Sequence, residues 1–400
     1  MDFKRKIAPA QLDRGVAGSA RKRCWVDVFI FGGLYFAIAR LGMAAAYGGT
    51  EVTTFVWPAA GVSAAAFLAR GTCVWPGIAV AAFAANVTAL WGRLPFPMLL
   101  LGAGGTAASS TLDAMLAAYF VVRITGTRFP FRRIEHVLVY MLFAALLSMM
   151  AGAVLGVGSL CVSGAVPWAE FRMLWRQWWM ENAIRVLITA YGILVLLEPD
   201  NRKLKWWQAV EAVVLMAAMG AFTWFAFRAS FGVPPAMAHG LLSLTIPMTG
   251  WAIFRFGRRG AAAALYILAF VSAYNTVRGF GPFAVSAPPH EALFMLQITL
   301  GVVAASVLTL LAALAERRDA EDAVRASENT IRGLLNASND PALLIDANGT
   351  VLAINEACAR ANGKAPAELT GVSVYDLQPP DTVENRRARI EQALRSGEPA

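Results

Sequence analysis

Charge, histidine and cysteine are all scarce in this sequence. Charged residues make up 15% of the 400 residues, and there are only three histidines and four cysteines. These seven residues are His136, His239, His290, Cys24, Cys73, Cys161 and Cys358. None of the cysteines has the pair spacing of a zinc site or of a disulfide framework. The sequence therefore predicts no metal site, no cofactor held by this chain and no catalytic residues.

Hydrophobic residues, in contrast, make up 58% of the chain. The apolar runs reach the roughly 20 residues that a helix needs to cross a bilayer. The first run, 25–46, exceeds the core of a signal peptide, which has about 7 to 15 residues. We therefore interpret it as a retained span behind a basic tail, 1–24. The formal net charge of +9 lies in this tail and in short loops, which favours the lipid bilayer as a partner and argues against nucleic acid.

Ten apolar stretches are candidate spans, and eight spans are the alternative. The stretches are 25–46, 54–69, 74–91, 97–122, 134–158, 177–197, 207–230, 238–256, 260–277 and 291–314. If both ends of the chain are cytoplasmic, the inner tail and loops before residue 260 hold eighteen Lys and Arg, and the outer ones hold six. This bias predicts a multi-pass inner-membrane protein with cytoplasmic N and C termini.

The composition changes abruptly at Glu316, where apolar sequence gives way to charged sequence. Apolar or small residues recur every three to four positions through 315–336. They are Ala320, Val324, Ser327, Ile331 and Leu334. This spacing is that of a short two-stranded coiled coil, which would make the protein a homodimer, and it equally fits an ordinary amphipathic connector. Either alternative predicts a helix that joins two domains.

The pattern changes to strands after Pro341. Two apolar runs, 342–346 and 351–355, flank Asn348–Gly349, which is a strong hairpin signal. Short helices follow, and the last is a charged run over 381–395. Two strands and a few helices cannot bury a complete core, so we expect the sequence to stop inside a domain.

Residues 337–400 resemble the first part of a Per-Arnt-Sim (PAS) domain. The resemblance rests on Leu334–Pro341, on Asp346 with Asn348–Gly349, on Asn355–Ala357 and on Gly363–Gly371. It implies an α+β fold whose five-stranded sheet cradles a small-molecule pocket. The last three strands are missing here, so the resemblance does not imply a bound ligand in this segment.

Residues 25–314 resemble the first class of bacterial membrane-associated sensor (MASE) domains. The motifs are Phe55–Gly61, Trp75–Gly77, Ala84–Asn86, Arg255–Gly260, Gly279–Phe283 and Gln297, followed by the exit at Ala315–Arg318. The sequence Met180–Arg185 departs from the Gly-Asp pair that the family tends to have after two tryptophans. Together the two resemblances imply an all-α polytopic bundle of eight to ten transmembrane helices, a helical linker at 315–336 and an incomplete PAS domain.

The short spans and the charges within spans supply the candidate binding residues. Trp57-Pro58 and Trp75-Pro76 interrupt two short spans. Either each proline only kinks its helix, or the backbone groups that it leaves without helical partners line a ligand cavity. Glu181 and Arg185 share one helix face and either neutralise each other or leave Arg185 to pair with Asp113. The full set of candidate ligand-binding residues is Trp57, Pro58, Gly61, Trp75, Asn86, Asp113, Glu181, Arg185, Asn275 and Gln297.

The resemblances imply a sensor that passes a small-molecule or protein signal through the linker helix to the PAS segment. In such proteins the output module is a diguanylate cyclase, a cyclic di-GMP phosphodiesterase or a histidine kinase, and none of these is within the 400 residues. Two other classes remain open. Broken spans and buried charges also fit a secondary transporter, and a non-enzymatic membrane regulator would need no output module.

Overall fold

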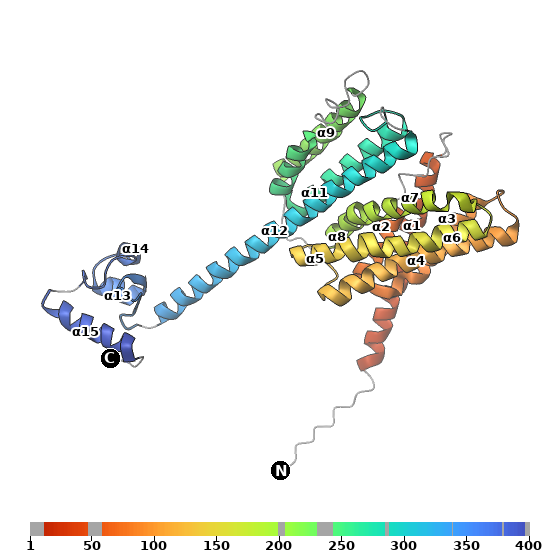
Figure 1. The fold of residues 1–400 in the computed structure, drawn as a ribbon. Coiled ribbons are helices and arrows are strands. Elements are labelled where there is room, and N and C mark those ends of the chain that lie inside the picture. Colours follow the sequence, from red (N-terminus) through yellow and green to blue (C-terminus); the bar gives the residue numbers. More distant parts are fainter. Residues whose placement is uncertain are drawn as a thin grey trace, which may run out of the picture. The chain divides into compact units, whose positions relative to one another are not determined.

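The computed structural model describes residues 12–46, 58–198, 205–229, 243–284, 288–337, 339–377 and 380–396. The chain divides into two compact units, Met1–Glu316 and Arg317–Ala400. The helices up to the end of the first unit are α1 (Leu12–Ala46), α2 (Ala59–Arg70), η1 (Gly71–Val74), α3 (Trp75–Leu90), α4 (Phe96–Thr125), α5 (Ile134–Val139), η2 (Tyr140–Ser148), α6 (Met149–Val162), η3 (Trp168–Glu170), α7 (Phe171–Arg185), η4 (Val186–Ala190), α8 (Tyr191–Leu197), α9 (Trp206–Ala229), α11 (Thr245–Val277) and α12 (Pro289–Ala337). Figure 1 shows α4, α6 and α7 side by side in this unit.

Eight helical stretches in the described part of the chain have the length and composition to cross a membrane. They are Cys24–Met43, Ala59–Leu90, Phe96–Thr125, Ile134–Val162, Trp168–Leu197, Trp206–Arg228, Thr245–Val277 and Glu291–Ile331. The expected fold class is confirmed, with its helical membrane unit and its small C-terminal sheet. The ten separate spans become eight stretches because the expected pairs 54–69 with 74–91 and 238–256 with 260–277 each fall within one stretch. Residues 54–57 and 238–242 lie outside the described residues.

The stretch Thr245–Val277 folds back on itself at Gly257. Gly257 has φ +64° and ψ −145°, a conformation that a helix does not contain. A β-carbon on Gly260 would lie 2.6 Å from the carbonyl oxygen of Ala252. In a straight helix two residues eight positions apart are separated by about 12 Å along the axis. The chain therefore reverses at Gly257, and α11 consists of two helical arms.

The stretch Ala59–Leu90 also reverses, at Gly71. The arm α3 runs in the same direction as α1, because Gly77 touches the Val28 carbonyl oxygen and Arg40 Nη1 donates to Thr88 Oγ1 at 2.8 Å. The arm α2 runs the opposite way, because Gly61 near its start lies against Thr189, whereas Arg70 at its end pairs with Asp27, next to the point where α3 meets α1. Gly71 has φ +77°, which a residue with a β-carbon rarely adopts.

Charged groups at one end of the membrane unit form a linked set, which we call the ion-paired end. Arg70 pairs with Asp27 at 3.3 Å, Arg132 pairs with Glu198 at 3.5 Å, and Arg258 pairs with the same carboxylate of Glu198. The first pair joins the middle of α1 to the end of α2, and the Glu198 pairs join the loop before α5, the end of α8 and the turn of α11. Arg128 of that loop also donates to the Ala69 carbonyl of α2 at 3.2 Å, which connects the two groups.

Three buried aromatic residues hold the helices together next to this end. Phe131 packs edge-on against Tyr140 at 5.1 Å and against Tyr191 at 5.0 Å between ring centres. The Tyr140 hydroxyl donates to the carbonyl of Val186 at 2.6 Å, and the Tyr191 hydroxyl donates to that of Arg258 at 3.0 Å. Buried hydroxyls need such partners. The aromatic cluster therefore fixes how the loop before α5, η2, the η4–α8 helix and the turn of α11 pack against one another.

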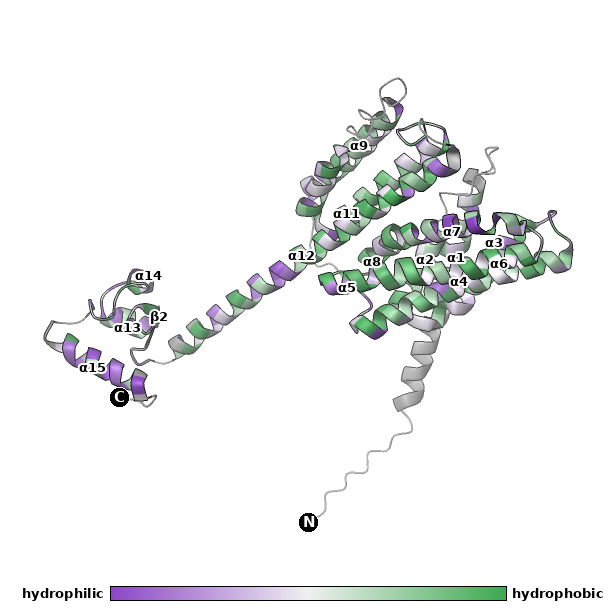
Figure 2. Ribbon diagram, in the orientation of Figure 1, coloured by the Kyte–Doolittle hydropathy of each residue, from purple (hydrophilic) through white to green (hydrophobic). Residues whose placement is uncertain are grey.

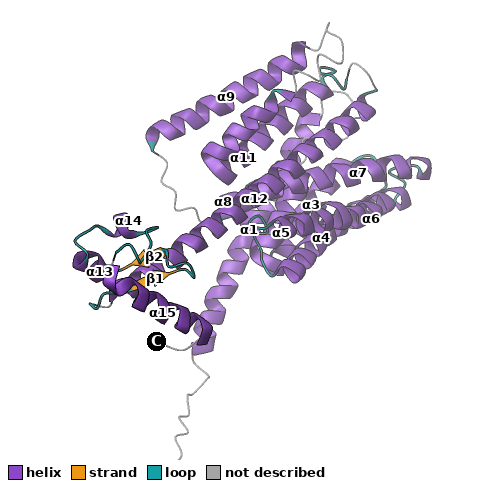
Figure 3. Ribbon diagram, turned by 60° about the vertical axis from the view of Figure 1, so that its left-hand side comes forward, coloured by secondary structure: helices purple, strands orange, loops and turns teal. Residues whose placement is uncertain are grey.

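The C-terminal unit contains a hairpin and three helices. These elements are β1 (Leu343–Ile345), β2 (Val351–Ile354), α13 (Glu356–Ala361), α14 (Pro366–Leu369) and α15 (Pro380–Ser396). The strands are antiparallel, with Leu343 opposite Ile354, and α14 packs against β2; Figure 3 shows the two strands in orange. The expected two-stranded start of the PAS fold is confirmed.

Candidate functional site

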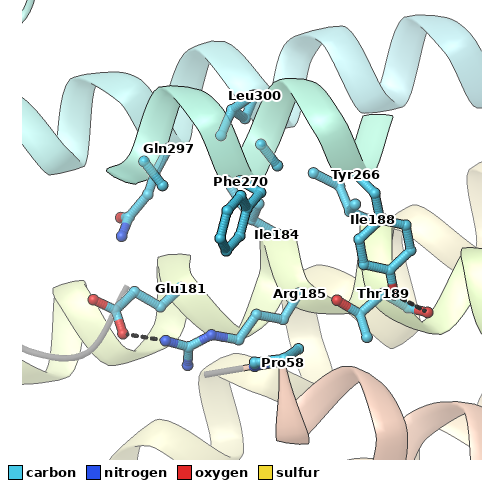
Figure 4. Close-up of a pocket in the computed structure, with 12 residues that line it drawn as sticks. Pro58, Glu181, Ile184, Arg185, Ile188, Thr189, Tyr266, Phe270, Gln297 and Leu300 are labelled. Atoms are coloured by element: carbon cyan, nitrogen blue, oxygen red, sulfur yellow. Dashed lines mark hydrogen bonds and ion pairs between the residues drawn. The ribbon is translucent and has the colours of Figure 1, made fainter. Parts of the chain in front are cut away.

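A cavity of about 110 Å³ lies between α7, η4, α11 and α12 in the membrane unit. Its lining residues are Pro58, Glu181, Ile184, Arg185, Ile188, Thr189, Tyr266, Ala269, Phe270, Ala273, Gln297 and Leu300. Figure 4 shows Glu181 and Arg185 on one wall and Gln297 on the facing wall. Four of the predicted residues, Pro58, Glu181, Arg185 and Gln297, thus surround one space although they come from three distant parts of the sequence.

Glu181 and Arg185 form a buried ion pair at the polar side of the cavity. Arg185 Nη2 donates to Glu181 Oε2 at 2.8 Å, and the two side chains are only 12% and 8% exposed. Arg185 Nη1 also donates to Asn182 Oδ1 at 2.9 Å. One helical turn separates the two charges, so α7 alone sets their geometry. The first of the two predicted pairings is therefore observed, and Arg185 does not pair with Asp113.

Gln297 brings an amide group from α12 to this cavity. Its side chain is 1% exposed, and neither its nitrogen nor its oxygen has a hydrogen-bond partner among the described residues. Within the same part of the chain, Glu181 Oε1 also has no hydrogen-bond partner. Leaving such buried groups unpaired costs about 1 to 3 kcal/mol each. The site therefore presents one donor and two acceptors to whatever enters it.

The remaining wall is apolar and rests on an irregular helix. The segment η4 is π-helical, a conformation that often marks functional positions, and it places Ile188 and Thr189 at the cavity. The Tyr266 hydroxyl donates to the carbonyl of Thr189 at 3.3 Å. Gly61 lies directly behind, where a β-carbon would be 2.6 Å from the carbonyl oxygen of Arg185. α2 can therefore pack against η4 only because residue 61 is a glycine.

The helix α12 connects this site with the ion-paired end. Near the cavity, the guanidinium of Arg176 lies over the Phe294 ring at 4.6 Å, and Gly301 packs against Ile184. At the other end, Glu316 Oε1 accepts a hydrogen bond from the backbone nitrogen of Ile134 at 2.9 Å. A carboxylate at this position stabilises the N-terminus of α5.

The other predicted residues lie apart from the cavity or outside the described residues. Trp75 is exposed on an apolar outer groove, and Asn86 donates to the Ala82 carbonyl within its own helix. Asn275 is buried near the end of α11 and donates to Val271. Trp57 lies outside the described residues. A ligand-binding role for any of these residues stays a prediction.

Asp113 occupies a separate buried position between α4 and α6. A β-carbon on Gly152 would lie 2.7 Å from Asp113 Oδ2, and Ser109 Oγ donates to the Gly152 carbonyl at 2.6 Å. Asp113 Oδ1 has no hydrogen-bond partner in the part of the chain that the structure describes. The two helices approach closely at Gly152, and Asp113 is not among the residues that line the Glu181 cavity.

Sequence reasoning missed the apolar half of the cavity. Ile188, Tyr266, Phe270 and Leu300 are ordinary residues of apolar spans, and no pattern separates them from lipid-facing neighbours. The role of Glu316 had a visible signal, because it is the first acidic residue after a long apolar run. Among the described residues, no cluster of three or more His, Cys, Asp and Glu side chains is arranged to hold a metal ion.

Comparison with known protein families identifies both parts of the chain. The MASE1 family matches residues 26–319, which is well over half of the chain, and a PAS fold matches residues 335–400. No curated protein and no solved structure matches the chain. The suspected order of a membrane-associated sensor followed by PAS is confirmed, and this order is that of a multi-pass membrane sensory protein.

Proposed function

Because this chain belongs to the MASE1 family and continues into a PAS fold, we propose that it binds a small ligand in the Glu181 cavity and signals through α12. The supporting observation is that Gln297 and Leu300, which line the cavity, lie on the helix that runs on to Ala337. A ligand in the cavity therefore touches the element that leaves the membrane. Figure 2 shows this helix changing from apolar to mixed hydropathy along its length.

The ligand acts only if it binds two arrangements of α12 with different affinity. Two groups on α12 supply the difference: the unpaired amide of Gln297 at the cavity and the carboxylate of Glu316, which is bonded at the start of α5. A ligand that engages Gln297 shifts the balance between the two arrangements. Signal transmission then requires no movement of the other helices.

We propose further that the protein is a homodimer through the segment 315–336. Val324, Ile331 and Leu334 are large apolar side chains that stay exposed in a single chain. With Ala320 and Ser327 they follow the alternating four-and-three spacing of a coiled coil, whose partner is a second copy of the same helix.

Cysteine cross-linking tests both proposals with one readout. In membranes of a cysteine-free background, Val324→Cys should form an intermolecular disulfide faster than the adjacent Arg325→Cys, which lies off the apolar stripe.

The same disulfide reports the coupling between cavity and α12. Gln297→Leu or Arg185→Ala should change the rate of cross-linking at Val324→Cys by roughly twofold or more at equal protein levels. Arg228→Ala is the matched control, because Arg228 stacks on Trp224 and Phe280, away from the cavity. Equal rates at 324 and 325 would contradict the dimer, and unchanged rates in both cavity variants would contradict the coupling.

The proposal also covers the membrane in which the protein lies and the activity that its signal controls. The basic residues of the ion-paired end favour the cytoplasmic side of a bacterial inner membrane, which puts both termini in the cytoplasm. The output is cyclic di-GMP synthesis or hydrolysis, or histidine kinase activity. Reading the coding sequence on from codon 400 and assaying the encoded protein for these three activities separates them. Ligand uptake into sealed vesicles, rather than binding without uptake, would favour the transporter class instead.

A further inference from the structure

The shape of the cavity limits the size of its ligand. Its volume of about 110 Å³ is somewhat below the roughly 150 Å³ of an engineered cavity that accommodates benzene. The walls around this space are the side chains of Ile184, Ile188, Ala269, Phe270 and Leu300. A single ring or a short branched chain is therefore the largest group that enters without movement of the helices.

The polar side of the cavity limits the charge of its ligand. Glu181 and Arg185 neutralise each other at 2.8 Å, so the site offers no net charge to an ion. A charged group would lose its hydration and gain no uncompensated partner, which is costly within a membrane. Among the residues that line the cavity, the buried side-chain atoms without a hydrogen-bond partner in the described structure are Glu181 Oε1 and the two amide atoms of Gln297.

The position of Phe270 indicates how the ligand reaches the site. Phe270 lines the cavity, and yet the residue is 58% exposed within the second arm of the membrane-spanning stretch Thr245–Val277. Its outer surface therefore faces hydrocarbon. A molecule that enters past this ring arrives from the bilayer and must itself dissolve in lipid.

We propose that the cavity binds a neutral, lipid-soluble molecule with a body the size of one ring and a hydroxyl or N–H head. The head donates to Glu181 Oε1 or to Gln297 Oε1 and accepts from Gln297 Nε2, while the body packs against Ile188, Phe270 and Leu300. Gln297 is thus the residue that distinguishes a polar head from a methyl group. The inference rests on the proposed function, because it names the ligand class of the same site.

Thermal unfolding of the full chain in nanodiscs, titrated with phenol, toluene, benzoate and benzylammonium, tests this inference. Phenol and toluene have nearly the same shape and differ in the hydroxyl, whereas the other two probes carry opposite charges. Phenol should bind roughly threefold to tenfold tighter than toluene, because one buried hydrogen bond contributes about that factor to a binding constant. Benzoate and benzylammonium should give no saturable shift of the unfolding temperature.

Two variants separate binding in the cavity from a general effect on the membrane. Ala269→Leu fills the space and should remove the response to both neutral probes. Gln297→Leu should keep toluene binding and remove the advantage of phenol. Leu112→Ala, on the exposed face of α4, is a control that should change neither response.

Each alternative result has a distinct meaning. Equal binding of phenol and toluene, abolished by Ala269→Leu, would overturn the role of the polar head while the cavity remained a ligand site. Saturable binding of benzoate or benzylammonium would overturn the neutral class and leave the proposed sensing function intact. If no probe gives a shift that Ala269→Leu removes, the ligand class is wrong, and the coupling between cavity and α12 is then judged by cross-linking at Val324→Cys alone.

Discussion

Gly61 shows how a single missing side chain positions the candidate site. A β-carbon there would overlap the Arg185 carbonyl oxygen at 2.6 Å and the side chain of Thr189. We expect Gly61→Ala to destabilise the protein by about 1 to 3 kcal/mol, the usual cost of overpacking. A lower midpoint of thermal unfolding in detergent would show this. Gly104→Ala is the matched control, because Gly104 has open space around it, and an equal loss in both variants would contradict the argument.

Asp346 makes the hairpin of the C-terminal unit sensitive to pH. Its carboxylate accepts hydrogen bonds from the backbone nitrogens of Thr350 and Asn348 at 2.8 and 2.9 Å. These bonds lower the pKa of Asp346 below its ordinary value of 3.8. A group whose folded-state pKa is lowered stabilises the fold above the unfolded-state pKa, and the effect disappears as the pH falls through the folded-state pKa.

Hydrogen exchange of the full chain measures this effect. After correction for intrinsic rates, protection of the Asn348 and Thr350 amides should be constant above about pH 5 and fall below it. The amide of Cys358 is the internal control, because it donates to the neutral side chain of Asn355. In Asp346→Asn the pH dependence should vanish. If all three amides lose protection together in the wild type, the turn is not the titrating element.

At the scale of elements, the reversal of α11 depends on Gly257. Its φ of +64° with ψ of −145° is a conformation that residues with a β-carbon rarely adopt. We expect Gly257→Ala to cost about 1 to 3 kcal/mol and to lower the thermal midpoint. Gly250→Ala, in the first arm of the same element and with open space around it, should leave the midpoint unchanged or raise it. Equal midpoints for Gly257→Ala and the wild type would show that the turn tolerates a side chain.

The sequence places the breaks between neighbouring spans, since Gly71 and Gly257 fall between the expected pairs 54–69 with 74–91 and 238–256 with 260–277, but it does not predict the contacts made at each break. Apolar runs of sufficient length identify spans because a bilayer demands continuous hydrogen-bonded helix. Whether a glycine within such a run bends the chain back depends on tertiary contacts, such as those of Gly260 with Ala252. The pairing of Glu181 with Arg185 is one of two alternatives that the sequence allows, since both residues lie on one helix face, and the structure decides in its favour. The meeting of this pair with Gln297 does not follow from the sequence, because it requires the packing of α7 against α12.

At the scale of the whole membrane unit, the reversal at Gly71 predicts the side on which each loop lies. Thr72 precedes α3 and Arg93 follows it, and both are exposed. In a cysteine-free background, Thr72→Cys should react with a membrane-impermeant maleimide from one side only, which is the cytoplasmic side in the proposed orientation. Arg93→Cys should react only from the opposite side, because α3 with 16 residues separates them by about 24 Å. Labelling of both positions from one side would show that α2 and α3 do not form a pair of membrane passes.

Because α12 is continuous, the effect of inserting residues into it depends on how many are inserted. Residues Pro289–Ala337 form one helix of 49 residues, and each residue turns an α-helix by about 100°. One residue added between Glu321 and Ala337 would therefore turn everything that follows by more than a quarter of a revolution. Seven added residues would restore the angular phase to within about 20° and move the following segment by about 10 Å along the axis. If α12 carries the signal as proposed, one added residue should therefore disturb the output more than seven added residues.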